Sequence, residues 1–251
     1  IRMPERVSKI TPINCQLGDR KCDFQVATNK GSYVGKTVIV GAGARRKKLG
    51  VPGEKEFDGK GVVYCSTCDA PLFRGKTVVV VGAGNSALEG VIDLFAYAEK
   101  IYLMVRSDTI RGDAVTREAV KKSEKVDIIY SAEITEILGD EVVTGVRYRD
   151  NKAHVDRELM LDGVFIEIGS VPNSEIVQGV VDMDQFGQIL IDSKHGTTSH
   201  PGIFAAGDVT DDPYKQNNIS AGDAVKATLA AYAYLLKRDA TSPMADRSSD
   251  V

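Results

Sequence analysis

The sequence predicts an α/β fold built around a Rossmann-like parallel sheet, and three neighbouring segments support this. Thr77–Val81 is an uninterrupted β-branched run, typical of a strand buried on both faces of a parallel sheet. Gly82 to Ala87 reads Gly-x-Gly-x-x-Ala and leads into apolar residues with helical spacing. Ile101–Val105 is a second apolar run, so the three segments form a complete β-α-β unit.

Length and composition indicate how many domains the chain has and which class of protein it belongs to. The 251 residues predict one large or two modest domains, and 43% hydrophobic with 27% charged residues is ordinary for a soluble globular protein. The net charge of −3 and the short basic run at 45–48 do not indicate nucleic-acid binding. No apolar stretch approaches the roughly 18 residues that span a bilayer. Two of the four cysteines are spaced C-x-x-C, which favours a reducing compartment, and we expect the cytoplasm.

The segments before the β-α-β unit are expected to be rich in strands. Asn29 and Gly31 fit a turn, because both residue types tolerate positive φ. Gly50, Pro52 and Gly53 interrupt regular structure and predict a linker. The expected strands are 24–28 and 37–40, and the apolar residues 62–64 lead into the cysteine pair.

Helices and strands alternate through the rest of the chain. Helices are expected at 86–97, 117–123 and 221–236. Residues 169–173 suggest a crossing to another domain, and the polar 241–251 is expected to fray. The expected strands are 126–130, 133–138, 142–148, 164–168, 189–191 and 203–206.

The glycine-rich turn has an earlier partial copy. Gly35–Gly43 resembles Gly75–Gly84, but only the second copy leads into a helix. A Gly-x-Gly without a helix cannot place a phosphate at a helix N-terminus. We therefore interpret Gly41 and Gly43 as a crossover rather than a second dinucleotide site.

The complete turn is a candidate dinucleotide site. Gly82 permits the tight turn, and Gly84 lets the backbone approach a pyrophosphate. The helix that starts at Asn85 and Ser86 offers free N–H groups to that anion. Ala87 still permits close packing of helix on strand. The alternative is a purely structural turn.

The residues at the end of the next strand indicate whether the nucleotide is NADP or NAD. Arginine there favours the 2′-phosphate of NADP, whereas a carboxylate favours NAD. Arg106 and Arg111 could both grip a phosphate, while Asp108 argues weakly for NAD. The alternative for the arginines is an exposed loop without a ligand.

The cysteine pair is the second candidate site. Cys65 and Cys68 can close a small disulfide and exchange it with a partner thiol, with Asp69 as the nearby acid–base group. A half zinc site is the weaker alternative, because Cys15 and Cys22 are spaced too widely to complete it, and we predict no metal site. We expect Cys15 and Cys22 to be ordinary small hydrophobic residues rather than a second redox pair.

A third motif, at 202–209, contains a late strand and the residues at its carboxyl end. A carboxylate at the end of that strand can accept hydrogen bonds from cofactor hydroxyls, or it can simply cap a turn. The helix that begins nearby could hold an electron-rich carbonyl edge at its N-terminus. The candidate cofactor-binding residues here are Gly207, Asp208, Lys215, Gln216 and Asn217.

In combination these motifs resemble the low-molecular-weight thioredoxin reductases. Cys-x-x-Cys-Asp, strand-Gly-x-Gly-x-x-Ala, an arginine-bearing loop, Gly-Ile-Phe-Ala-Ala-Gly-Asp-Val and Lys-Gln-Asn occur in the family's order from Gly31 to Leu236. The resemblance implies a Rossmann-like NAD(P) domain inserted into a discontinuous FAD-binding domain. The NAD(P) domain with its C-x-x-C would be 48–169, and the FAD-binding domain 1–47 and 170–251.

The resemblance also implies an NADPH-dependent thioredoxin-disulfide reductase and a role for each residue. Cys68 would face the flavin, Cys65 would attack the partner's disulfide, and Asp69 would donate a proton. Asp208 would contact the ribityl chain of FAD, with Gln216 and Asn217 near the isoalloxazine ring. Electrons would pass from NADPH through FAD and the redox-active disulfide to thioredoxin, or to a thioredoxin-like or glutaredoxin-like protein. The enzyme would be a homodimer.

Two departures from the family pattern leave alternatives open. Val105 and Ser107 replace a histidine and an arginine of the family's NADPH loop, so NADH remains an alternative donor. The family's first strand, Gly-x-Gly-x-x-Gly turn and helix, which bind the ADP part of FAD, have no counterpart before Thr37. We therefore expect an N-terminally truncated molecule with an incomplete FAD-binding domain.

Other functions are compatible with the same motifs. One is a related flavin dithiol reductase that serves a peroxidase, and another is a dithiol oxidase, which the intact turn from Gly82 to Ala87 disfavours. A flavin-free, non-catalytic nucleotide-binding subunit is an alternative of another class, which the C-x-x-C disfavours.

Overall fold

The computed structural model describes residues 3–15 and 21–240, and the chain divides into two compact units. We call Arg46–Ser170 the inserted unit. Ile1–Arg45 and Val171–Val251 together form the discontinuous unit. Among the described residues, each of the hydrophobic clusters draws its members from a single unit, so each unit has its own core.

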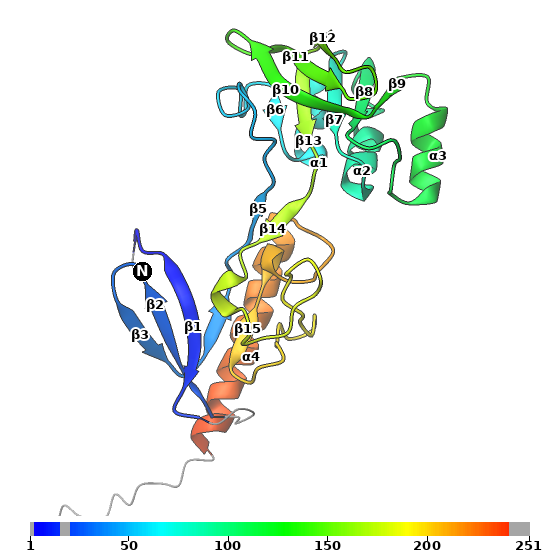
Figure 1. Cartoon of the computed structure of the whole chain (residues 1–251). Helices are drawn as coiled ribbons and strands as arrows, with labels where there is room; N and C mark the ends of the chain where they lie inside the picture. Colours follow the sequence, from blue (N-terminus) through cyan, green and yellow to red (C-terminus); the bar gives the residue numbers. More distant parts are fainter. Residues whose placement is uncertain (1–2, 16–20, 241–251) are drawn as a thin grey trace, which may run out of the picture. The chain divides into compact units, whose positions relative to one another are not determined.

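The inserted unit is built on a five-stranded parallel sheet (Figure 1). Its middle strands are almost completely buried, which explains their uninterrupted apolar sequences. The strand order is β6 (Val62–Val63), β13 (Gly163–Ile166), β7 (Thr77–Val81), β8 (Lys100–Val105) and β9 (Val126–Tyr130).

Different layers cover the two faces of this sheet. Val78 and Val80 of β7 belong to the core shared with helix α2 (Asn85–Leu94), while Val79 and Val81 belong to the core on the opposite face. The opposite face packs against an antiparallel sheet (Figure 1). On the side of α2, helix α3 (Ala114–Lys122) adds Val120 to the core. The strands of the antiparallel sheet are β10 (Ala132–Gly139), β11 (Val143–Asp150) and β12 (Val155–Met160).

The discontinuous unit combines two small sheets with one long helix. The strands β1 (Val7–Ile13), β2 (Asp23–Thr28) and β3 (Ser32–Gly35) form an antiparallel sheet. The strands β4 (Val38–Val40) and β15 (Ile203–Ala205) pair in parallel, although they are far apart in sequence. Ala227 and Ala231 of helix α4 (Asn217–Ala240) pack on Phe204 and Ala206. None of the described helices is long and apolar enough to cross a membrane.

The chain passes between the two units through a pair of short strands. These are β5 (Ala44–Arg46) and β14 (Ser170–Pro172), which form a two-stranded sheet. The amide of Lys47 donates to the carbonyl of Gly169 over 3.0 Å, and the amide of Asn173 donates to that of Gly43 over 2.9 Å. The paired residue number falls from 173 to 169 as the first strand runs from 43 to 47, so the pairing is antiparallel.

The predicted α/β class is confirmed, and most predicted elements are present with shifted ends. Helix α3 begins before the predicted residue 117 because Asp113 Oδ1 accepts hydrogen bonds from the amides of Val115 and Thr116. Helix α2 ends at Leu94, before the predicted end at 97. The strand predicted at 189–191 is wrong, since Ile189 forms only isolated bridges. The strands β1, β3, β5, β6, β12 and β14 were not predicted, and 241–251 lies outside the described residues.

Candidate functional site

The glycine-rich turn connects β7 to α2 as the sequence predicts. A side chain at Gly82 would place its Cβ 2.4 Å from the carbonyl oxygen of Glu167 and 2.7 Å from the Cβ of Ala87. Ala87 itself is completely buried. Gly82 and Ala87 therefore allow the close packing of strand and helix on which the turn depends.

Gly84 has a different environment. It precedes the first residue of α2 in an extended conformation, and no side chain caps that helix end. A Cβ at Gly84 would meet nothing within 4 Å. The helix start is thus uncapped by side chains and open on the side of the Gly84 Cα, which suits the approach of a phosphate.

The turn lines a cleft of about 640 Å³ in the inserted unit. Arg106 and Arg111 line the same cleft, and the amide of Arg111 donates to the carbonyl of Ala83 over 2.8 Å. Asp108 is not among the described residues that line it. The cleft thus has the size of a ligand site and cations that could hold a phosphorylated nucleotide.

Asn85 and Ser86 have different positions at the start of α2. Ser86 lines the cleft. The side-chain oxygen of Asn85 accepts a hydrogen bond of 2.7 Å from the amide of Asp113, so Asn85 holds the segment that leads to α3. The structure therefore directs the side chain of Asn85 to the protein rather than to the cleft.

The cysteine pair lies in the same unit as the cleft. Cys65 and Cys68 form a disulfide at the start of α1 (Ser66–Asp69), with their Cα atoms 5.3 Å apart. The hydroxyls of Ser66 and Thr67 donate to Asp93 of α2 over 2.9 and 3.0 Å. The segment that carries the disulfide is thus hydrogen-bonded to the helix that begins at the nucleotide turn.

Two carboxyl groups near the disulfide have perturbed acidity. Burial raises the pKa of Asp69, which favours its protonated form and suits the predicted proton donor. Glu167 lies beyond the end of β13, is 7% exposed, and accepts a hydrogen bond of 3.2 Å from the amide of Ser66. Burial raises the pKa of Glu167 to about 7. Glu167 also lines the cleft, so it lies between the cysteine segment and the nucleotide turn.

The third candidate site lies in the discontinuous unit. Gly207 has a φ of +73°, and a Cβ there would come within 2.9 Å of the Ser220 hydroxyl. That hydroxyl donates to Asp208 over 3.3 Å, which joins the end of β15 to the first turns of α4. Gln216 and Asn217 are exposed where α4 begins. A half-buried carboxylate beside an exposed helix start could hold the hydroxyls and the carbonyl edge of a flavin.

Lys215 faces the same segment. Its ammonium donates to the carbonyl of Thr210 over 2.6 Å. Burial lowers the pKa of Lys215, although the charge of Asp208 acts in the opposite direction. Lys215 therefore fixes the backbone just after Asp208.

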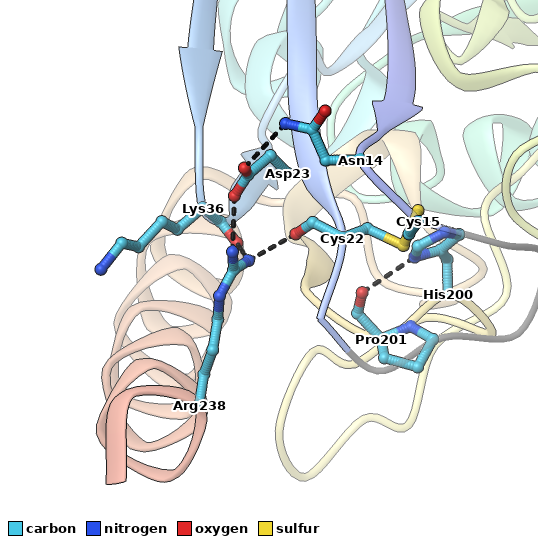
Figure 2. The surroundings of a disulfide bond; sticks show 8 residues. All are labelled: Asn14, Cys15, Cys22, Asp23, Lys36, His200, Pro201 and Arg238. Carbon is cyan, nitrogen blue, oxygen red and sulfur yellow. Dashed lines mark hydrogen bonds and ion pairs between the residues drawn. A yellow bond between two sulfur atoms is a disulfide. The ribbon is translucent and has the colours of Figure 1, made fainter. Parts of the chain in front are cut away.

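The expectation for Cys15 and Cys22 is wrong, because the two residues form a disulfide with Cα atoms 5.0 Å apart (Figure 2). They follow β1 and precede β2, whose antiparallel pairing aligns Ile13 with Asp23 and so brings the cysteines together. Arg238 of α4 donates to the carbonyl of Cys22 and lies 2.5 Å from the Asp23 carboxylate (Figure 2).

Sequence reasoning also missed Glu167. It is the only charged residue in the apolar run Val164–Ile168, and a single charge within a buried strand pattern is a signal that could have identified it. In the inserted unit the structure thus groups Cys65, Cys68 and Asp69 on one short segment, and places Gly82, Gly84, Ser86, Arg106 and Arg111 around one cleft.

Comparisons with known proteins match this arrangement. The family model described as pyridine nucleotide-disulphide oxidoreductase matches residues 3–231. An alkyl hydroperoxide reductase subunit of Pseudomonas putida is 45% identical over 83% of this chain and 40% of that protein. NADH dehydrogenase of Bacillus subtilis is 40% identical over 87% of this chain and 43% of that protein. The chain thus spans less than half the length of these relatives.

A solved structure is similar over a larger share of its length. Thioredoxin reductase from Streptococcus pyogenes has a TM-score of 0.82 and 35% identity, over 92% of this chain and 73% of that protein. The thioredoxin reductase from Giardia duodenalis also has a TM-score of 0.82, at 33% identity. The chain therefore belongs to the pyridine nucleotide-disulphide oxidoreductases, and within them to the thioredoxin reductase type.

Proposed function

We propose that this chain is the disulfide-reducing part of a thioredoxin-disulfide reductase. Electrons from NADPH would pass through FAD to the Cys65–Cys68 disulfide and then to a thioredoxin-like or glutaredoxin-like protein. The observation that carries the proposal is the connection of Cys65–Cys68 to α2, the helix that begins at the nucleotide turn. FAD, when bound, supplies the centre that accepts hydride and reduces the disulfide.

Each cysteine has a separate task in this proposal. Cys68 faces the flavin, and the thiolate of Cys65 attacks the disulfide of the partner protein. Asp69, whose pKa is raised by burial, supplies a proton to the departing thiolate. In the discontinuous unit, Asp208 would hold the ribityl chain, while Gln216 and Asn217 would lie near the isoalloxazine ring.

The cations of the cleft support NADPH as the donor. Arg106 and Arg111 both line it, and either guanidinium could hold the 2′-phosphate. NADH is the alternative, because Val105 and Ser107 do not supply further donors of the kind the family uses, and the Bacillus subtilis relative is named an NADH dehydrogenase. Comparing flavin bleaching by the two nucleotides under anaerobic conditions distinguishes them.

A peroxidase partner is the second candidate acceptor. The observation that favours it is the 45% identity to the alkyl hydroperoxide reductase protein of Pseudomonas putida. The solved thioredoxin reductases favour thioredoxin, at 35% and 33% identity. Both acceptors require the same dithiol, so they differ only in the protein that the Cys65 thiolate attacks.

The test uses the full-length protein supplied with FAD. NADPH should bleach the visible flavin absorbance, and the reduced enzyme should reduce thioredoxin. Cys65→Ser should slow thioredoxin reduction about 100-fold or more, with flavin reduction by NADPH intact. Cys15→Ser, in the other disulfide, is the matched control and should retain turnover.

The outcomes separate the alternatives. Undiminished thioredoxin reduction by the Cys65→Ser protein would overturn the assignment of the nucleophile. Reduction of a peroxidase partner in preference to thioredoxin would favour the second candidate. A full-length protein that takes up no FAD would favour the flavin-free alternative. We further propose a cytoplasmic homodimer, which cell fractionation and sedimentation would test.

A further inference from the structure

We propose that Glu167 is a positioning residue for the dithiol: it ties the backbone amide beside Cys65 to the end of β13, and its negative charge opposes formation of the Cys65 thiolate. This inference deepens the proposed function, because it concerns the same cysteine pair. It differs from the roles of Cys65, Cys68 and Asp69 because Glu167 lies about one hundred residues away along the chain and on another element.

The first support is the geometry around the carboxylate. Glu167 Oε1 accepts from the amide of Ser66 over 3.2 Å, and Ser66 directly follows Cys65. A Cβ added at Gly90 would come within 3.3 Å of Ser66 and 3.5 Å of Glu167 Cγ, so both side chains pack against the same helical glycine. The carboxylate is thus fixed next to the segment that carries Cys65, and 7% exposure leaves it little screening by water.

The second support is the charge that surrounds Glu167. Arg46 of β5 favours the ionised carboxylate, whereas Asp93 and Glu89 of α2 oppose it. Burial is the largest influence and raises the pKa of Glu167 to about 7. Asp69 of α1 and Asp93, which accepts from the hydroxyls of Ser66 and Thr67, are further acids near the disulfide. The other charged residues that line the cleft with Glu167 are Lys47, Lys48, Arg106, Arg111 and Glu133.

The chemical consequence follows from the needs of disulfide exchange. Reduction of the Cys65–Cys68 disulfide breaks the S–S bond and takes up two electrons and two protons to give two thiols. Attack on a partner then requires loss of one proton from Cys65. An ionised carboxylate nearby raises the pKa of that thiol, and a neutral one does not. Near neutral pH, Glu167 is divided between these two forms.

The test measures the acidity of Cys65 directly. In full-length Cys68→Ser protein, Cys65 is the free thiol and the Cys15–Cys22 disulfide remains closed. Alkylation of Cys65 by iodoacetamide is followed by peptide mass spectrometry between about pH 5.5 and 9.5. The compared variants carry Glu167→Gln, Glu167→Asp or Glu89→Gln in the same background. Gln retains the acceptor oxygen but loses the charge.

The rate of Cys65 alkylation in the Glu167→Gln variant, divided by the rate in its parent, should depend on pH. The ratio should be near one at about pH 5.5, where Glu167 is neutral, and rise to about 3- to 10-fold near pH 8. It should return toward one when Cys65 is fully ionised in both proteins. Glu89→Gln removes an exposed charge from the same region without touching the Ser66 amide, and should change the rate less than twofold.

Several results would overturn the inference. Superimposable pH profiles would exclude an effect of the charge, and a rate ratio that is constant with pH would indicate a merely structural role. If Glu167→Gln does not fold, Glu167→Asp decides. This variant keeps the charge, so alkylation of Cys65 should be slowed near pH 8 as it is in the parent. A profile without that slowing would contradict the proposal. Neither flavin nor partner enters the assay, so its failure would leave the proposed function intact.

Discussion

Gly82 and Gly84 lie two positions apart in one turn, yet they respond to different constraints. The space around Gly82 is filled by the backbone at Glu167 and the side chain of Ala87. The space beside Gly84 is open, and its backbone angles of −101° and −171° are accessible to any residue. Fold and ligand binding can therefore be separated by single substitutions.

We predict that Gly84→Ala lowers NADPH affinity but not stability. The new methyl group would occupy the space through which a pyrophosphate approaches the backbone. The dissociation constant should rise at least about 10-fold by calorimetry, while the free energy of unfolding should change by less than about 0.5 kcal/mol. Gly82→Ala is the contrasting variant and should lose about 2–3 kcal/mol of stability through overpacking. Equal effects of the two substitutions on stability would contradict this distinction.

We also predict that Glu167→Gln stabilises the inserted unit at alkaline pH. The ordinary pKa of 4.5 applies to the unfolded chain, and the value in the fold is about 7. The protonated carboxyl is therefore favoured in the fold, and wild-type stability is lost as pH rises from 4.5 through 7. The variant should gain at most about 3 kcal/mol relative to wild type at pH 8. Urea unfolding at several pH values checks this, and a gain that is the same at pH 5 and pH 8 would refute it.

At the scale of elements, the Cys15–Cys22 disulfide joins the ends of β1 and β2. Cys22 is buried, and Arg238 of α4 binds its carbonyl, so this crosslink belongs to the core region of the discontinuous unit. Two cysteines separated by seven positions close a short loop. Such a loop restricts the unfolded chain and thereby stabilises the fold.

We predict that replacing both Cys15 and Cys22 by serine destabilises the discontinuous unit by about 2–3 kcal/mol, which is the loop-closure effect expected for this length. The transition of the inserted unit should remain unchanged. Denaturant unfolding followed by hydrogen exchange resolves the two units. The double replacement of Cys65 and Cys68 is the control, and it should leave the discontinuous unit unaffected.

Local patterns predicted the elements around the nucleotide turn because β7, α2 and β8 are adjacent in sequence. The Cys15–Cys22 disulfide depends on the register of β1 against β2, which no local pattern specifies. Strand β12 was missed because its residues are mostly polar and exposed, as suits the edge of a sheet. The buried position of Glu167 depends on α1 and α2 packing over it, which a single sequence does not reveal.

At the scale of the whole molecule, the two units have separate cores. Among the described residues, the clusters on the two faces of the five-stranded sheet contain only residues of Arg46–Ser170. The cleft with Gly82, Gly84 and Arg106 is likewise lined only by residues of that range. We therefore expect this unit to fold, and to bind a nucleotide, without the rest of the chain.

We predict that a polypeptide limited to Arg46–Ser170 folds cooperatively and binds NADPH with an affinity within about threefold of the full chain. Calorimetry and circular dichroism would test this, with Gly84→Ala in the same fragment as the control with weakened binding. A fragment that is folded but binds no NADPH would show that the site needs residues from outside the unit.

The antiparallel pairing of β5 with β14 has a consequence for the engineering of the chain. A two-residue turn is the usual connection between such strands. Here the connection between the two strands is an entire folded unit, Arg46–Ser170, in place of a short loop. The paired strands β5 and β14 are therefore the point at which a different folded unit could be grafted.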